Sequence, residues 1–464
     1  MKLAYRPDID GLRAVAVASV VAFHAFPESF KGGFVGVDVF FVISGFLISS
    51  IILSNLSSGD FSFRDFYARR IKRIFPALIL MLSTSLAIGW FFLLPDEFVQ
   101  LGKHTIAGLT FLSNIALWRE SGYFDTASNS KPLLHLWSLG IEEQFYIFWP
   151  LFLALAFLKK IAPLKIVLGL GLASFVANIA FINSHPSETF YLPMTRFWEI
   201  LLGCYLALAQ SRAKNQVELR SWAGLLLISL AIIIMNEGMA FPGWWALLPC
   251  LGTFLVIQAG PETWLNKKIL SHRSLVTVGL ISYPLYLWHW PLLVFLSIIH
   301  GKSAPPTEQR ILAVVLSFIL AWLTFRFVEI PLRNGRLRFL NKTPILVCAA
   351  IAVLLISTLI LKSKIPPASA RLNVEEYMTA HRDWDFPGDM QRFFHQGARF
   401  YKIGSSSKSA LFIGDSNVQQ YGPRIESLCP KILLVTGHLI SLVAGVAFLF
   451  QIYALRIHSI ALCF

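Results

Sequence analysis

Long apolar runs alternate with short polar segments over the first 360 residues of the chain. The runs hold roughly 17 to 25 residues each, the length that an α-helix needs to cross a bilayer. The first run lacks a small-residue cleavage site and a second run follows closely, so we expect a retained helix rather than a signal peptide. The pattern predicts an all-α polytopic membrane protein with about eleven spans, at residues 10–26, 34–53, 75–94, 144–158, 164–182, 197–210, 222–236, 244–258, 275–299, 311–328 and 344–361.

Lysine and arginine are concentrated in every second loop between these runs. A cytoplasmic N-terminus would place the richer loops, such as the one that holds Arg64 and Lys72, on the cytoplasmic side at every step. This distribution obeys the positive-inside rule, which supports both the number of spans and their orientation. Because eleven is an odd number, the chain after the last span is predicted to lie outside the cytoplasm.

The composition agrees with a membrane protein. Hydrophobic residues make up 56% and charged residues 14% of the 464 positions, too little charge to cover the surface of a soluble chain. The net charge of +14 is divided among the loops, so we expect no nucleic-acid partner. None of the five cysteines forms a C-x-x-C pair, and three lie in apolar runs, so we expect neither a disulfide framework nor a metal site.

Arg13 and His24 both stand in the first apolar run. On a helix, residues eleven apart differ by about 20° around the axis and by about 16 Å along it, so the two share one face. Alone, Arg13 could be a snorkelling anchor and His24 an interfacial residue bonded to a carbonyl. Two basic residues on one face favour a functional pair, with Arg13 nearer the cytoplasm and His24 nearer the outside.

The second run and the loop after it carry two further patterns. In "GGFVGVDVFFVISGFLIS", residues 32–49, the glycines and Ser44 permit the close approach of another helix or of a ligand chain. Arg69, Arg70 and Arg73 then follow at helical spacing before Pro76. These arginines are either ordinary positive-inside residues or a phosphate clamp, because guanidinium groups bind phosphate oxygens bidentately.

Carboxylates stand at the start of the fourth span, in "HLWSLGIEEQFYIFWP". Glu142 and Glu143 are expected at its outer mouth, where two adjacent carboxylates cost free energy unless they are paired or used. On a helix His135 would share a face with Glu142. This segment is therefore a candidate site.

Two later spans hold further polar side chains. Arg196 and Glu199 lie three residues apart and could simply pair with each other. His289 lies between Pro284 and Pro291, and prolines interrupt membrane helices where the backbone lines a cavity. His289 is therefore either a site residue or a packing residue.

After the last span the chain changes character. Residues 363–408 are polar and contain prolines, as in an extracytoplasmic linker. Residues 409–431, beginning "SALFIGDSN", are typical of a short strand, a tight Gly-Asp-Ser turn and a helix. Residues 432–464 are again apolar enough for a twelfth span.

Taken in order, these motifs resemble the acyltransferase-3 membrane enzymes that O-acylate cell-surface glycans, in the subgroup with a fused C-terminal SGNH domain. The resemblance covers about the first 335 residues and includes "GVDVFFVISGF", "RRIKRIFPA", "RFWEILLG", "SYPLYLWHWP" and "FVEIPLR". It implies a bundle of about ten helices at 1–335, a linking helix at 336–362, a linker at 363–408, the start of an SGNH-like α/β domain at 409–431 and an atypical tail at 432–464.

The resemblance also implies an activity, the transfer of an acyl group from cytoplasmic acyl-CoA to a sugar hydroxyl on the outer face of the membrane. His24 would be the catalytic base, with Arg13 beside it, and Glu142 or Glu143 would orient the imidazole or hold the sugar. Arg69, Arg70 and Arg73, with Ser44, would bind the donor. The residues expected to bind the acceptor are Asp38, His135, Arg196, Glu199 and His289.

Ser416 in "FIGDSN" resembles an SGNH nucleophile. The family's Asp-x-x-His block is not recognisable downstream, since neither His438 nor His458 has an aspartate three residues before it. We therefore expect an incomplete SGNH domain and assign the chemistry to His24 rather than to Ser416.

The expected donor co-substrate is acyl-CoA, with acetyl the commonest acyl group, and no permanently bound cofactor is expected. The expected partners are membrane lipid and a glycan acceptor such as lipopolysaccharide O-antigen, exopolysaccharide or peptidoglycan. The expected location is the bacterial inner membrane, with the C-terminal segment in the periplasm. Two alternatives stay open, a transporter or flippase of a lipid-linked sugar and an inactive paralogue.

Overall fold

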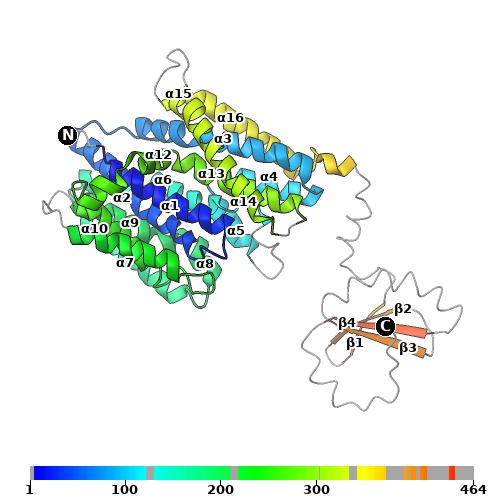
Figure 1. Ribbon diagram of the computed structural model, residues 1–464. Coiled ribbons are helices and arrows are strands. Elements are labelled where there is room, and N and C mark those ends of the chain that lie inside the picture. The colour runs from blue at the N-terminus through cyan, green and yellow to red at the C-terminus, as the bar shows by residue number, and fades with distance from the viewer. Residues whose placement is uncertain are drawn as a thin grey trace. The chain divides into compact units, whose positions relative to one another are not determined.

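The computed structural model describes residues 5–121, 130–209, 218–301, 304–333 and 342–371, together with four short strands between residues 391 and 444. The chain divides into two units, residues 1–369 and 370–464. The first unit is a bundle of helices (Figure 1). Its α-helices are α1 Pro7–Ala25, α2 Gly36–Ser58, α3 Phe63–Phe92, α4 Pro95–Leu109, α5 Ser113–Glu120, α6 Leu136–Leu158, α7 Pro163–Phe181, α8 Pro186–Tyr191, α9 Pro193–Ala209, α10 Glu218–Ile234, α11 Leu247–Ala259, α12 Arg273–Leu280, α13 Ser282–Ile299, α14 Thr307–Leu323, α15 Ile330–Arg333 and α16 Lys342–Leu361.

Short helical turns of other types complete the unit. The 3-10 turn η1, Gly33–Val35, leads into α2, and η5 covers Ala368–Arg371. The π-helical turns η3, Leu265–Leu270, and η4, Thr324–Glu329, lie before α12 and after α14.

The all-α membrane fold is confirmed, because every predicted span corresponds to a helix of the first unit. Among the described residues, seven helical stretches are long and apolar enough to cross a membrane: those of α2, α3, α6, α7, α13, α14 with its extension to Leu332, and α16. The helix α1 carries three charged residues, and α9, α10 and α11 have at most 17 residues each.

The predicted ninth span, 275–299, is interrupted, but the break does not lie at either of its prolines. The chain turns at Ile281, which separates α12 from α13, and Pro284 falls in the first turn of α13. A proline is tolerated there because the first N–H groups of a helix have no partner within it. Pro291, in contrast, lies inside α13 without ending it.

Glycines allow α1, α2 and α9 to pack very closely in the core. A Cβ atom on Gly45 of α2 would lie 1.8 Å from the Ile200 carbonyl oxygen of α9, and one on Gly203 of α9 would lie 2.0 Å from the Val42 oxygen of α2. Gly36, at the start of α2, approaches the Ala16 carbonyl of α1 in the same way. Of the two roles left open for the glycines of residues 32–49, helix packing is therefore the one that the structure supports.

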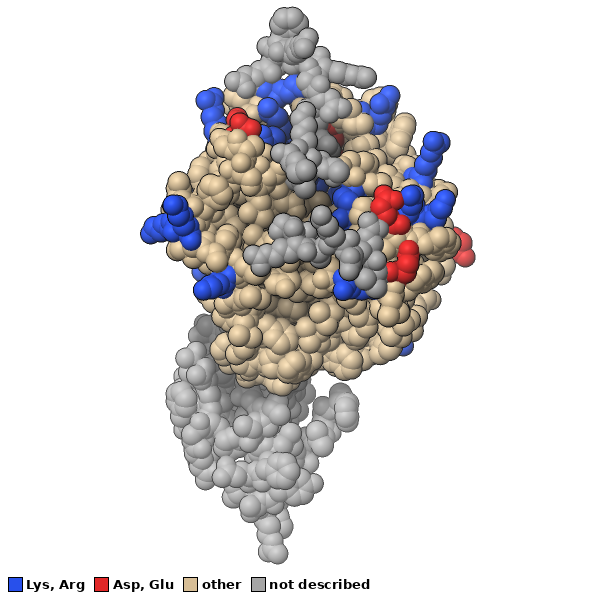
Figure 2. All heavy atoms as spheres, turned by 90° about the vertical axis from the view of Figure 1, so that its left-hand side faces the viewer, with Lys and Arg blue, Asp and Glu red and all other residues tan. Residues whose placement is uncertain are grey.

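The N-terminal end of α1 lies on a face of the molecule that is rich in lysine and arginine (Figures 1 and 2). Blue side chains surround this face, and acidic side chains are fewer. Arg13 lies nearer this end of α1, and His24 lies near the opposite end.

A four-residue ionic cluster joins α4, α5 and the segment before α6. The Glu120 carboxylate lies 2.6 Å from Lys103 Nζ, 2.9 Å from His104 Nε2 and 3.0 Å from Lys131 Nζ. Burial alone would raise the pKa of Glu120, but the hydrogen bonds and charges of its basic partners outweigh burial and hold the pKa well below its ordinary value.

The chain that follows α16 is fastened to the end of α3. Trp90 Nε1 donates to the Pro366 carbonyl oxygen at 3.0 Å, and Ser369 Oγ donates to the Leu93 oxygen at 2.6 Å. The first residues of the predicted linker thus belong to the helical unit.

The second unit holds a four-stranded sheet with strand order β1-β2-β4-β3. The strands are β1 Gln391–His395, β2 Ala398–Ile403, β3 Lys408–Gly414 and β4 His438–Ala444. The strand β3 coincides with the strand predicted before the Gly-Asp-Ser turn, while Ser416 lies outside the described residues. Within the apolar tail, residues 438–444 form β4, which pairs in parallel with β3, and the other residues of 432–464 lie outside the described residues.

Candidate functional site

Two adjoining cavities lie inside the helical unit. The arginine cavity has a volume of about 100 Å³, and Arg13, Arg70 and Arg73 lie in its wall. The histidine cavity has a volume of about 480 Å³, and its wall includes His24 and His135. Val37 and Tyr286 line both cavities, so the two spaces meet at these side chains.

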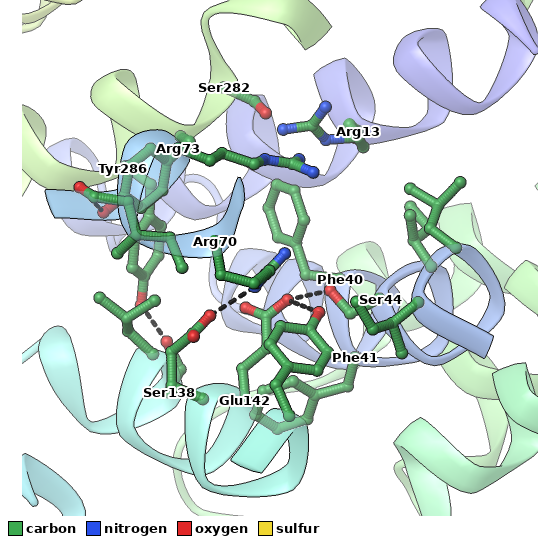
Figure 3. Close-up of a pocket in the computed structure, with 18 of the residues that line it drawn as sticks. Arg13, Phe40, Phe41, Ser44, Arg70, Arg73, Ser138, Glu142, Ser282 and Tyr286 are labelled. Atoms are coloured by element: carbon green, nitrogen blue, oxygen red, sulfur yellow. Dashed lines mark hydrogen bonds and ion pairs between the residues drawn. The ribbon is translucent and has the colours of Figure 1, made fainter. Parts of the chain in front are cut away.

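The arginine cavity holds a network of charged and hydroxyl groups (Figure 3). Arg70 Nη2 lies 2.5 Å from Glu143 Oε1, and the Arg70 guanidinium lies 4.0 Å from the centre of the Tyr146 ring. Glu142 accepts hydrogen bonds from Tyr146 OH, at 2.5 Å, and from Ser44 Oγ. Both carboxylates thus have partners deep in the protein, as buried charges require.

The predicted arginine clamp is only partly assembled. Arg70 and Arg73 line the cavity with Arg13, and Figure 3 shows the Arg13 and Arg73 side chains close together beside Ser282. Arg69 is exposed and does not line the cavity. Position 69 lies about 100° around α3 from position 70, on the side away from the cavity. Ser44, which the sequence also assigned to donor binding, does line it.

The expected place of Glu142 and Glu143 is wrong. The helix α6 begins at Leu136, so both glutamates lie one to two turns inside it rather than at an outer mouth. They join the arginine cavity, while His135, just before α6, lines the histidine cavity. The idea that a glutamate orients His24 is therefore not supported, because both carboxylates bind other side chains.

His24 contacts another histidine instead. Its Nδ1 atom lies 2.9 Å from Nε2 of His289, and the two rings lie edge to edge and nearly parallel, with centres 5.2 Å apart and 17° between their planes. His289 Nδ1 lies 3.2 Å from the carbonyl oxygen of Leu285, one turn earlier in α13. Trp290 packs its edge against the His24 ring, with centres 4.5 Å apart, and its Nε1 donates to the Lys131 carbonyl oxygen. The His24 ring is thus held from two sides.

His135 completes a group of three imidazoles. Its ring centre lies 5.8 Å from that of His289 and 5.4 Å from that of Tyr286. The residue is 97% buried, and no side chain of the described structure bonds to either ring nitrogen. Tyr286 OH bonds to the His135 carbonyl oxygen at 2.8 Å and to Ser138 Oγ at 2.7 Å. His135 thus lines the histidine cavity while its two ring nitrogens are buried.

A fully buried ion-pair triad adjoins the histidine cavity. Arg196 lies 3.0 Å from Asp38 and 3.2 Å from Glu199, so the predicted pairing of Arg196 with Glu199 is confirmed and Asp38 joins it. Aromatic rings surround the guanidinium at 5.4 to 5.8 Å, those of Phe41, Trp137, Phe190 and Phe241. Asp38 and Arg196 line the cavity, whereas Glu199 lies behind it.

Two members of this triad also belong to the one group of potential metal ligands among the described residues. Atoms of Asp38, Glu199 and Cys250 lie within 4.8 Å of one another. Arg196 already pairs with both carboxylates, and its positive charge opposes a metal ion at the same place.

At its rim the histidine cavity is polar. Arg310 donates to the Ala25 carbonyl oxygen at 3.0 Å and lies 3.4 Å from Glu28. The pKa of Glu28 lies below its ordinary value, first because a backbone N–H bonds to its carboxylate and also because Arg310 is near. Sugar-sized ligands need such a combination of aromatic walls and a few polar groups.

Sequence reasoning missed Tyr286, Tyr146 and Ser138. Tyr286 lies three residues before His289, a spacing that puts both on one face of a helix, so this signal was present. Tyr146 lies four residues after Glu142, again one helical turn away. Ser138 carried no such signal, because its role depends on contact with α13.

Comparison with known proteins identifies the family of the chain. A family profile described as "Acyltransferase domain" matches residues 6–326. The chain is 35% identical to "Peptidoglycan O-acetyltransferase OatA" of Listeria monocytogenes over 72% of its own length, and 33% identical to "Putative peptidoglycan O-acetyltransferase YrhL" of Bacillus subtilis over 73%. It spans 57% and 56% of the length of these two relatives. No solved structure matches the chain.

Proposed function

Because this chain belongs to the acyltransferase domain family, we propose that it transfers an acetyl group from acetyl-CoA to a hydroxyl of a cell-surface glycan within a bacterial plasma membrane. The observation that carries the proposal is the meeting of the two cavities at Val37 and Tyr286. One cavity offers cations for an anionic donor, and the other offers an imidazole for a hydroxyl acceptor. The names of the relatives favour acetyl as the acyl group and peptidoglycan as the acceptor.

The arginine cavity is the donor side of the proposed site. Three guanidinium groups and two carboxylates line it, which leaves an excess of positive charge. Guanidinium groups bind phosphate oxygens through paired N–H donors, so this cavity suits the phosphates and thioester arm of coenzyme A. The basic face at the N-terminal end of α1 (Figure 2) then lies in the cytoplasm, in accord with the positive-inside rule.

The histidine cavity is the acceptor side. Its imidazoles, the Asp38–Arg196 pair and its aromatic walls provide polar and stacking contacts for a sugar ring. His24 takes the proton of the acceptor hydroxyl, and the oxygen attacks the thioester carbonyl. The carbon–sulfur bond then breaks, and the CoA thiolate recovers a proton as the free thiol.

The test uses the full chain in sealed membrane vesicles that contain a peptidoglycan fragment. Labelled acetyl-CoA is added to the basic face in inverted vesicles, or to the opposite face in right-side-out vesicles. We expect label in the glycan only from inverted vesicles, and at least about a 100-fold loss of transfer in His24→Ala.

The arginines supply a matched pair of variants on one helix. Arg73→Ala should raise the KM for acetyl-CoA about tenfold, as the loss of one charge-assisted hydrogen bond would. Arg69→Ala should leave it unchanged, because Arg69 does not line the cavity. If glycan moves across the membrane without label transfer, the chain is a flippase, and if neither occurs it is an inactive paralogue; either result refutes the proposal.

A further inference from the structure

His289 lies between a carbonyl oxygen and the proposed base. Its Nδ1 atom faces the Leu285 oxygen at 3.2 Å, and its Nε2 atom faces His24 Nδ1 at 2.9 Å. A carbonyl oxygen can only accept a hydrogen bond, so Nδ1 of His289 carries the hydrogen. His289 is fully buried, and burial favours the neutral ring, which has a single N–H.

The protonation of His24 follows from that of His289. With its hydrogen on Nδ1, His289 presents a bare Nε2, which can only accept a hydrogen bond. The 2.9 Å contact then requires that His24 Nδ1 carry the hydrogen. In the neutral His24 ring, Nε2 keeps the lone pair, because the hydrogen bond at one nitrogen fixes the state of the other.

We propose that His289 is a positioning residue, which holds His24 in the tautomer whose Nε2 is the catalytic base. This inference rests on the proposed function of His24 as the base of acyl transfer. It replaces both roles left open for His289 from the sequence, as a substrate contact or as a packing residue.

The hydrogen bonds of His289 also stabilise His24 after it has taken up a proton. When the acceptor O–H breaks, its proton moves to Nε2 of His24 while the oxygen forms the new bond to the acyl carbon. His24 is then an imidazolium, and its Nδ1–H donates a charge-assisted hydrogen bond to the bare Nε2 of His289. The leaving thiolate accepts a proton as the carbon–sulfur bond breaks, and His24 returns to its neutral tautomer.

Two substitutions of His289 each preserve one of its two hydrogen bonds. Glutamine places an amide oxygen near the position of Nε2, where it can still accept from His24 Nδ1–H. Asparagine is shorter and places its amide near Nδ1, so it keeps the bond to Leu285 but does not reach His24. A role in helix packing alone would tolerate asparagine at least as well as glutamine.

We therefore compare His289→Gln, His289→Asn and His289→Phe in the full chain reconstituted in lipid. Transfer in His289→Gln should stay within about tenfold of the unmodified chain, whereas kcat in the other two should fall by about 100-fold or more with the KM for acetyl-CoA unchanged. His300, which caps the C-terminal end of α13, is the matched control, because its Nδ1 makes the same kind of bond to the Leu296 oxygen, at 3.0 Å. His300→Phe should keep full activity.

Nitrogen NMR of histidine-labelled protein provides a readout that needs no turnover. We expect His24 Nδ1 protonated and Nε2 bare in the unmodified chain, and a mixture of tautomers in His289→Asn. A hydrogen on His24 Nε2 in the unmodified chain would overturn the inference, as would equal activity of the asparagine and glutamine variants. If the expected tautomer is found but the unmodified chain transfers no label, the proposed function fails while the positioning by His289 stands.

Discussion

Replacing Gly45 with alanine tests whether the close contact between α2 and α9 carries the geometry of the acceptor site. The new Cβ would lie 1.8 Å from the Ile200 oxygen, and real Cβ contacts are essentially never under 3.0 Å. The helices α2 and α9 must therefore separate by about 1.2 Å. The Asp38–Arg196 pair bridges the same two helices at 3.0 Å, so such a shift would lengthen it to about 4.2 Å, beyond hydrogen-bond range.

Two costs add in this variant. Overpacking a core costs about 1–3 kcal/mol, and breaking a buried ion pair costs about 3–5 kcal/mol. Relaxation elsewhere reduces the sum, so we expect a loss of at least about 3 kcal/mol in the free energy of unfolding and a fall in Tm of at least about 5 °C.

Tryptophan fluorescence of the purified protein during heating measures this loss. Gly169→Ala on α7 is the control, because a Cβ there meets no atom within 4 Å and alanine is up to about 1 kcal/mol better than glycine inside a helix. Its Tm should equal or exceed that of the unmodified chain. A Tm within 1 °C of the unmodified chain for Gly45→Ala, with acetyl transfer intact, would refute the reasoning.

Three further predictions concern polar contacts. Arg196→Met leaves two buried carboxylates without a cation and should lower the free energy of unfolding by about 3–5 kcal/mol. Lys267→Met, at an exposed ion pair, should lower it by under about 1 kcal/mol. Equal effects of the two substitutions on thermal unfolding would contradict this account. Because folding lowers the pKa of Glu120, the ionised carboxylate stabilises the fold fully above about pH 4.3, the ordinary pKa of a glutamate. This stabilisation is lost as the pH falls through the lower pKa of the folded state, so Tm should drop in acid. Glu120→Gln should cost about 1–3 kcal/mol at pH 7 and flatten that drop, and an unchanged pH profile of Tm would show that the cluster does not stabilise the fold. Tyr146→Phe removes one hydrogen bond to Glu142 and should raise the KM for acetyl-CoA about two- to tenfold. The kcat should not change.

Hydropathy was sufficient to find a helix under each apolar run, because burial in lipid requires long apolar segments with satisfied backbones. It missed the shorter helices α4, α5, α8 and α15 and did not separate α12 from α13. It failed where a helix extends beyond its apolar part. The helix α6 begins at Leu136 rather than at residue 144, since polar residues inside a bundle can be helical when other side chains pair with them. That difference of eight residues moved Glu142 and Glu143 from an expected membrane edge into the arginine cavity.

Contacts between distant helices were beyond the reach of sequence spacing. The spacing of Arg13 and His24 correctly predicted that both face the interior, where each lines a cavity. Spacing could not show that His289, 265 positions later, lies against His24, because that contact depends on how α13 packs on α1. It also could not separate Arg69 from Arg70, since only the neighbouring helices decide which side of α3 is enclosed.

The polar groups of the two cavities are bonded differently. In the arginine cavity Arg70 pairs with Glu143, and Glu142 accepts from Ser44 and Tyr146, which makes charge tolerable at this depth. In the histidine cavity, by contrast, the tautomer that we propose for His24 leaves its Nε2 unbonded. A buried polar group without a partner costs about 1–3 kcal/mol, and binding of an acceptor hydroxyl would recover that cost at the place where the proton must leave.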